Sequence, residues 1–151
     1  MKSYSLIFFL FLLVSCNTDL RKDEPVKLDE DCKPIINKFF NSLLSNNYRR
    51  AIDELLADNE NIDQKDSNTI SLKEKFYAIN EGSGNYRGQT LIKKRGLNSD
   101  LAVFSYLAKY DKKFYRFVFV FYNNGVRTKI FKFSFDDNAA LELEESLKLY
   151  L

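Results

Sequence analysis

The sequence predicts an α+β domain in which helices precede an antiparallel sheet. Apolar residues recur every three or four positions between residues 33 and 80, as they do in amphipathic helices. From residue 86 to 135 the pattern changes to strand-like segments separated by short turns. A second helical pattern closes the sequence at residues 139–151. Helices kept apart from a run of consecutive strands are typical of the α+β class.

The first two helices are predicted from their apolar stripes. The first spans about residues 33–45, where Pro34 suits the first turn and Asp31 is the expected N-cap. The second spans about residues 48–57, after an Asn-Asn break.

A shorter third helix is predicted over residues 72–80. Ser71 and Glu74 have the spacing of a capping box, so the helix is expected to begin just after Ser71. A Gly-Ser-Gly sequence at residues 82–84 ends it.

Four strands are predicted next, at about residues 86–95, 101–110, 113–122 and 126–135. Asn124-Gly125 is a typical tight-turn sequence, and the other connections are also short. Short connections join antiparallel neighbours, so the strands are expected to form a meander.

The third strand is apolar on both faces, which predicts a central strand covered on both sides. One face carries Tyr115, Phe117, Phe119 and Phe121, and the other carries Phe114, Val118, Val120 and Tyr122. In the fourth strand the alternation predicts that Phe131, Phe133 and Phe135 face the core and that Ile130 faces away.

The last predicted element is a C-terminal helix over residues 139–151. Asn138 is its expected cap, and Leu143, Leu147 and Tyr150 lie along one side of it.

The amino-terminal sequence has the features of a secretory signal peptide. Lys2 is followed by nine consecutive apolar residues, from Leu6 to Val14. A helix needs about 20 residues to cross a bilayer, so this run is too short to span one. It does match the apolar region of a signal peptide.

Leu13-Val14-Ser15-Cys16 resembles the lipobox of bacterial lipoproteins. The resemblance implies cleavage between Ser15 and Cys16, a diacylglycerol on the Cys16 thiol and an acyl chain such as palmitate on the new amino terminus. Two or three acyl chains anchor a protein stably in a membrane. The predicted organisation is a signal peptide at 1–15, a lipidated cysteine and flexible tether at 16–31, and one domain at 32–151.

The lipobox resemblance implies a cell-envelope protein, and the residue after the cysteine bears on which membrane holds it. Asn17 stands where some bacteria use Asp to retain lipoproteins in the inner membrane, so the outer membrane is expected. Lys22-Asp23-Glu24 is similar to signals that send lipoproteins to the cell surface. A solvated charge cluster in the tether is the alternative, so a periplasmic and a surface location both stay open.

The order of elements resembles the nuclear-transport-factor-2-like, cystatin-like cone fold, especially its small lipoprotein members. The resemblance rests on Phe39-Phe40, the "NNYRRAIDEL" junction, Gly88, and the aromatic strands around residues 116–122. It implies helices packed on a bent four-stranded sheet around a pocket. The candidate pocket residues are Tyr106, Tyr110, Tyr115, Phe117, Phe119 and Tyr122.

The composition argues against catalysis. The chain has no histidine, which excludes Ser-His-Asp and Cys-His mechanisms and removes the commonest transition-metal ligand. The strand carboxylates fall at ends and turns, at Asp100, Asp111, Asp136 and Asp137. We therefore expect no enzyme, no cofactor and no metal, with a cone-fold isomerase or cyclase as the third hypothesis. Cys32 is interpreted as a small packing residue.

The expected function is binding. The leading hypothesis is a small apolar ligand or a protein partner held by the cone-like domain. The alternative is an immunity or envelope-assembly module that uses a basic strand face, because residues 86–135 carry 11 Lys and Arg against 2 Asp. Nucleic acid is not an expected partner in the cell envelope.

Overall fold

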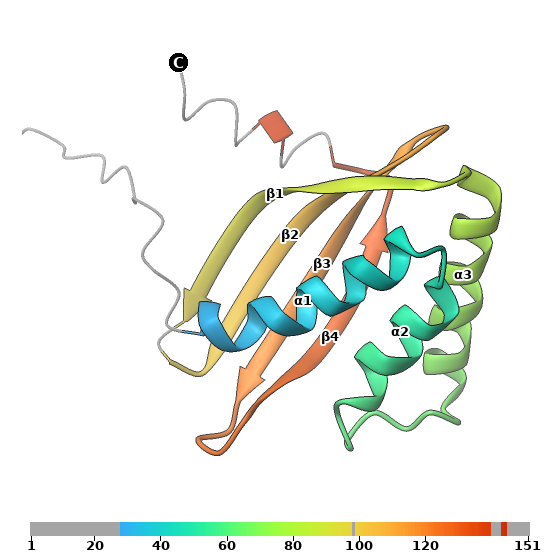
Figure 1. The fold of residues 1–151 in the computed structure, drawn as a ribbon. Coiled ribbons are helices and arrows are strands. Elements are labelled where there is room, and N and C mark those ends of the chain that lie inside the picture. The colour runs from blue at the N-terminus through green and yellow to red at the C-terminus, as the bar shows by residue number, and fades with distance from the viewer. Residues whose placement is uncertain (1–27, 98, 140–142, 145–151) are drawn as a thin grey trace, which may run out of the picture.

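The computed structural model describes residues 28–97, 99–139 and 143–144. It has three helices followed by four strands, which confirms the α+β prediction (Figure 1). The elements are α1 (Asp29–Leu44), α2 (Tyr48–Ala57), α3 (Ser67–Ser83), β1 (Tyr86–Leu97), β2 (Leu101–Tyr110), β3 (Phe114–Asn123) and β4 (Thr128–Asp136).

Three predicted segments fall wholly or mainly on residues outside this description. The signal peptide and nearly all of the tether do so, as does most of the C-terminal helix. Of that helix only Ala139, Leu143 and Glu144 are described, and the Leu143 N–H donates to the Ala139 carbonyl at 2.9 Å. Among the described helices, none has the length and hydrophobicity needed to cross a membrane.

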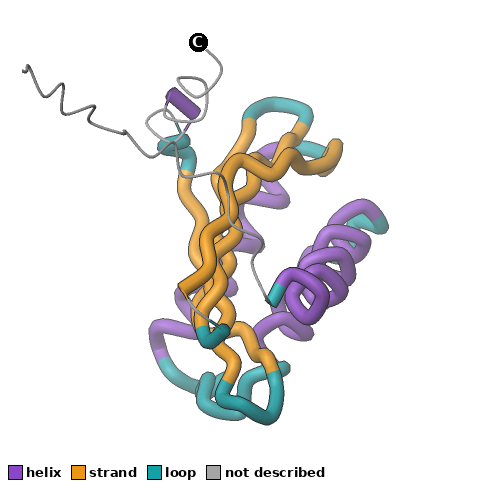
Figure 2. Tube along the Cα trace, turned by 90° about the vertical axis from the view of Figure 1, so that its left-hand side faces the viewer, coloured by secondary structure: helices purple, strands orange, loops and turns teal. Residues whose placement is uncertain are grey.

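The four strands form one antiparallel sheet in the order β1-β2-β3-β4, as the short connections predict. Gly125 has a φ of 86° in the β3–β4 turn, a conformation that glycine adopts without strain. The strands curve around α1, which crosses one face of the sheet (Figures 1 and 2).

Helix α1 begins four residues before the predicted start. Its cap position is Leu28, which makes no side-chain capping bond, so the prediction of Asp31 as N-cap is wrong. Asp29, Glu30 and Asp31 all lie in the first turn, where negative charge favours the helix dipole. Pro34 accordingly lies inside the helix and not in its first turn.

Helix α3 also begins earlier than predicted, and Ser71 is not its cap. The Asp66 side chain caps it by accepting hydrogen bonds from the backbone N–H groups of Asn68 and Thr69, at 2.8 and 3.2 Å. The helix continues three residues beyond the predicted end at residue 80, through Gly82, and ends at Ser83. Gly84 follows with a φ of 81°, and a Cβ there would clash with the side chain of Asp111.

The core lies between the helices and one face of the sheet, here called the inner face. Phe39 of α1 has its ring centroid 5.3 Å from that of Phe119 and 5.3 Å from that of Phe133. Phe76 of α3 lies 5.9 Å from Phe117 on the same face. Helices α1 and α3 therefore pack on the same side of the sheet.

The other side of the sheet, here called the outer face, corrects the prediction that β3 is covered on both sides. Phe114 and Tyr122 on this face are 44% and 45% exposed, and Val118 and Val120 are half-buried. Phe117 and its neighbours on the inner face are fully buried.

A β-bulge corrects the prediction for β4. The register shifts where Val120 and Phe121 pair with β4, so that Ile130 lies opposite Phe121 on the inner face. Ile130 is fully buried, whereas Phe131 is 61% exposed. The strict alternation assumed from the sequence fails at this point, and Phe133 resumes the inward pattern.

Candidate functional site

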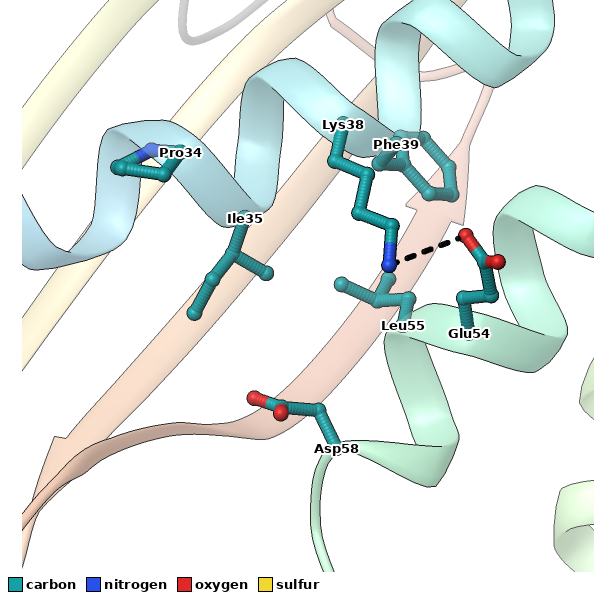
Figure 3. Close-up of a pocket in the computed structure, with 7 residues that line it drawn as sticks. All are labelled: Pro34, Ile35, Lys38, Phe39, Glu54, Leu55 and Asp58. Carbon is teal, nitrogen blue, oxygen red and sulfur yellow. Dashed lines mark ion pairs between the residues drawn. The ribbon is translucent and has the colours of Figure 1, made fainter.

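An open groove lies between α1 and α2 (Figure 3). It has a volume of about 220 Å³. Its lining residues are Pro34, Ile35, Lys38, Phe39, Glu54, Leu55 and Asp58. Ile35 and Phe39 come from the apolar stripe of α1, and Leu55 comes from the stripe of α2. The groove forms because the two stripes meet over the sheet without closing completely. We call it the α1–α2 groove.

Charged side chains stand at the rim of this groove. The Lys38 Nζ lies 3.4 Å from the Glu54 Oε2, as Figure 3 shows. Arg50 donates to the other oxygen of Glu54 at 2.7 Å. The hydrogen bond from Arg50, joined by that from Lys38, lowers the pKa of Glu54 against the opposing effect of burial. The groove thus has an apolar floor beside an ionised carboxylate and a lysine.

The size of the groove limits what it can hold. Sites for drug-sized ligands have volumes of about 300–1,000 Å³. A volume of about 220 Å³ instead suits one large apolar side chain or a small fragment.

In the part of the chain that the structure describes, no cluster of His, Cys, Asp or Glu is arranged to hold a metal ion.

Five of the six predicted pocket residues lie together on the inner face, within the core. Phe117 and Phe119 are fully buried, and the Tyr106 ring lies 6.0 Å from that of Phe119. The rings of Tyr110 and Tyr115 lie 5.7 Å apart. Aromatic side chains therefore fill the region where a cone would hold its ligand.

The buried tyrosine hydroxyls bond within the protein. Tyr110 donates to the Asn80 Oδ1 at 2.8 Å, and the hydroxyls of Tyr115 and Ser83 lie 2.9 Å apart. Burial raises the pKa of Tyr110 and of Tyr106, which keeps both phenols neutral at physiological pH. These hydroxyls complete the core.

Tyr122, the sixth predicted residue, lies apart from the others. It lines a second cavity of about 220 Å³ at the β3–β4 hairpin. That cavity is lined by Asn59, Asn61, Ile62, Tyr122, Asn124, Lys129, Ile130 and Phe131. The Asn59 amide there donates to the Ile130 carbonyl at 2.7 Å, so the loop after α2 is fixed against β4.

Several bases of the strands are paired with acids elsewhere in the domain. Lys94 lies 2.9 Å from Asp29 of α1, and Arg116 lies 2.7 Å from Asp136. Glu60 pairs with Lys129 of β4. The local excess of positive charge in residues 86–135 is therefore partly neutralised by the fold.

Cys32 fits its predicted packing role. It is fully buried in α1, and burial, together with Asp31 and Asp29, raises the pKa of its thiol to about 12. A thiol in this environment stays protonated and unreactive at neutral pH.

Sequence reasoning did not select the groove residues as a site. Ile35, Phe39 and Leu55 were identifiable only as core positions, and nothing in the sequence marks where two apolar stripes leave a gap. The pairing of Lys38 with Glu54 joins two helices and has no signature in sequence spacing.

The comparisons with known proteins assign no family. No family profile matches the chain, and no curated protein or solved structure matches it significantly.

Proposed function

We propose that this chain is a lipid-anchored cell-envelope protein whose domain binds a partner protein at the α1–α2 groove. The partner inserts one apolar side chain between Ile35, Phe39 and Leu55. The charged rim of Lys38 and Glu54 orients the segment that carries this side chain.

The filled aromatic core is the observation that favours a protein partner. Phe117 and Phe119 are fully buried where the cone resemblance implies a ligand pocket. Both cavities of about 220 Å³ instead open at the edge of the core. A shallow apolar notch with polar neighbours is what an anchoring side chain at a protein interface occupies.

Site-specific photo-crosslinking tests the groove. A photoreactive amino acid replaces Lys38 at the rim, and in a matched variant it replaces the exposed Asn37, which does not line the groove. We expect a discrete adduct with an envelope protein from position 38 and none from position 37. Adding Ile35→Asp should remove the adduct, and equal adducts from both positions would contradict the proposal.

The lipid anchor is supported by the Leu13-Val14-Ser15-Cys16 sequence after the apolar run. Cys16→Ala should abolish metabolic acyl labelling and move the protein out of the membrane fraction. Retention of the variant in the membrane would contradict the anchor.

A small apolar ligand is a second candidate, favoured by the apolar floor of the groove. Native mass spectrometry of the protein purified from its host distinguishes a small ligand from a protein partner, because a ligand adds a fixed mass that Ile35→Asp removes.

The basic strand face is the other interaction surface to test. Arg95, Lys109 and Lys132 form no ion pair with any residue that the structure describes, and the proposed partner there is an acidic protein surface.

A further inference from the structure

The β3–β4 hairpin carries a group of exposed apolar residues at the end of the domain where the tether joins it. We propose that this hairpin surface, formed by Tyr122, Val126 and Phe131, contacts the lipid bilayer that holds the anchored chain. The inference rests on the lipid anchor proposed above and adds to it an orientation of the domain.

The hairpin lies beside the point where the tether enters the domain. The Thr128 hydroxyl donates to the Asp31 carboxylate in the first turn of α1 at 2.9 Å. Lys94 near the end of β1 pairs with Asp29 in the same turn. In Figure 1 the start of α1 and the β1–β2 and β3–β4 turns all lie at the lower left of the domain. This end is therefore the one nearest to the membrane anchor along the chain.

The hairpin surface is the most exposed apolar part of the described residues. Val126 is 87% exposed and Phe131 is 61% exposed, which are the two highest values among the large hydrophobic side chains. Tyr122 is 45% exposed on the neighbouring strand. Aromatic residues are enriched where proteins meet the interface of a membrane.

The backbone of the turn is already hydrogen-bonded, which lowers the cost of moving it toward lipid. The Asn124 side-chain oxygen accepts from the N–H groups of Val126 and Arg127, both at 3.0 Å. The Asn123 side chain accepts from the Gly125 N–H at 2.7 Å. Unpaired backbone groups are what exclude most turns from apolar surroundings, and these three N–H groups have partners.

The contact combines an apolar part with a smaller electrostatic part. Arg127 and Lys129 share one carboxylate, that of Glu60, so these three groups keep a net charge of +1. Lys132, next to Phe131, is exposed. Bases near an anionic surface gain about 1 kcal/mol each. We therefore expect high salt to weaken the contact and its apolar part to persist.

The strength of the contact requires the anchor. Burying a valine side chain in the bilayer raises the constant for partitioning from water into the membrane by roughly tenfold. A gain of this size does not hold an unanchored protein on a bilayer. A tether raises the effective concentration of the hairpin at the membrane to about millimolar, so the same contact can orient an anchored domain. Residues 17–27 span at most about 40 Å when extended, which keeps the domain close to the surface.

Single tryptophans test this orientation, because the chain contains none. Val126→Trp and Leu44→Trp are made in the full lipidated chain and reconstituted into phosphatidylethanolamine–phosphatidylglycerol vesicles with brominated acyl chains. Leu44 is the matched control, since it is 59% exposed at the opposite end of α1. We expect a blue shift and strong quenching for the tryptophan at position 126, and neither for that at position 44.

A second pair of variants excludes an effect of the introduced tryptophan itself. Phe131→Trp should be quenched, and adding Val126→Asp should reduce the membrane-contacting population about tenfold or more. Equal quenching at positions 126 and 44, or none at 126, overturns the inference, and so does a protein crosslink from position 126 in place of lipid quenching. Failure of the anchor is a separate result, because an unacylated chain does not float with the vesicles at all.

Discussion

The inner and outer faces of the sheet are built from the same strands and differ in what their side chains do. On the inner face of β3, Phe117 and Phe119 are fully buried against rings from α1 and α3. Their neighbours on the outer face, Val118 and Val120, are half-buried. Both faces of this strand are apolar in sequence, so hydrophobicity alone does not decide which face becomes the core. The aromatic rings carried by the helices decide it.

The sharpest test of this difference compares adjacent residues of β3. Phe119→Ala removes a ring that lies 5.3 Å from that of Phe39 and 5.1 Å from that of Phe133, and it should lower the free energy of unfolding by about 3–5 kcal/mol. Val118→Ala on the outer face should lower it by about 1 kcal/mol or less. Urea denaturation measures both values. Equal losses would show that the outer face is also packed as a core.

Hydrogen bonds of buried hydroxyl groups also stabilise the inner face. Tyr110→Phe leaves the Asn80 Oδ1 without its 2.8 Å donor, and should cost about 1–3 kcal/mol in the free energy of unfolding. Tyr115→Phe should lower the free energy of unfolding less in a chain that already carries Ser83→Ala than in the native chain. In the native chain the substitution leaves the buried Ser83 hydroxyl without its partner, whereas in the Ser83→Ala chain no hydroxyl remains unpaired. The double-mutant cycle is measured by thermal or urea unfolding. Strict additivity of the Tyr115 and Ser83 effects would show that these hydroxyls are not coupled.

The sequence predicts the fold well where the structure of a segment depends on its own residues, such as an apolar helical stripe or a turn sequence. The helical stripes of α1 and α2, the Asn-Gly turn and the short connections give the class, the strand order and the meander. The start of α1 was misplaced because Asp31 has the identity of a cap, while the charge of three acids extends the helix back to Asp29. The start of α3 was misplaced for a similar reason, since Asp66 and Ser71 are both good caps and the structure uses the first.

Features that depend on two segments at once were not predictable from local patterns. The bulge that buries Ile130 and exposes Phe131 comes from the register between β3 and β4. The α1–α2 groove depends on how closely two apolar stripes meet. Five predicted pocket tyrosines and phenylalanines did come together, but they lie within the core, and none of the five lines either of the two cavities described above.

An ion pair at the edge of the inner face gives a weaker, pH-dependent test. Burial alone would raise the pKa of Asp29, but hydrogen bonds from Lys94 and Lys33 outweigh it and lower the pKa. Folding thus favours the ionised form of Asp29. The contribution of this carboxylate to the free energy of unfolding is fully present above the unfolded pKa of about 3.9, and it is lost as the pH falls through the lower folded pKa. Asp29→Asn should therefore cost about 1 kcal/mol at pH 7.

The control for Asp29→Asn is the same comparison at pH 3. The difference in urea midpoint between the native chain and Asp29→Asn should shrink there, because the carboxyl of the unfolded chain is protonated below its pKa of about 3.9 and folding must then release that proton. A difference that is unchanged between pH 7 and pH 3 would show that the side chain contributes by packing and not by charge.

The smallest effects are expected from the bases of the outer face. Lys109 and Lys132 are exposed and form no ion pair with any residue that the structure describes, so Lys109→Glu and Lys132→Glu should each change the free energy of unfolding by less than about 0.5 kcal/mol. Urea denaturation of each variant beside Val118→Ala checks this. If the fold does not need these charges, their presence on an apolar face favours a role in contacts outside the domain. A loss of 1 kcal/mol or more would instead mean that the bases stabilise the domain itself, and the outer face would then belong to the fold as much as the inner one.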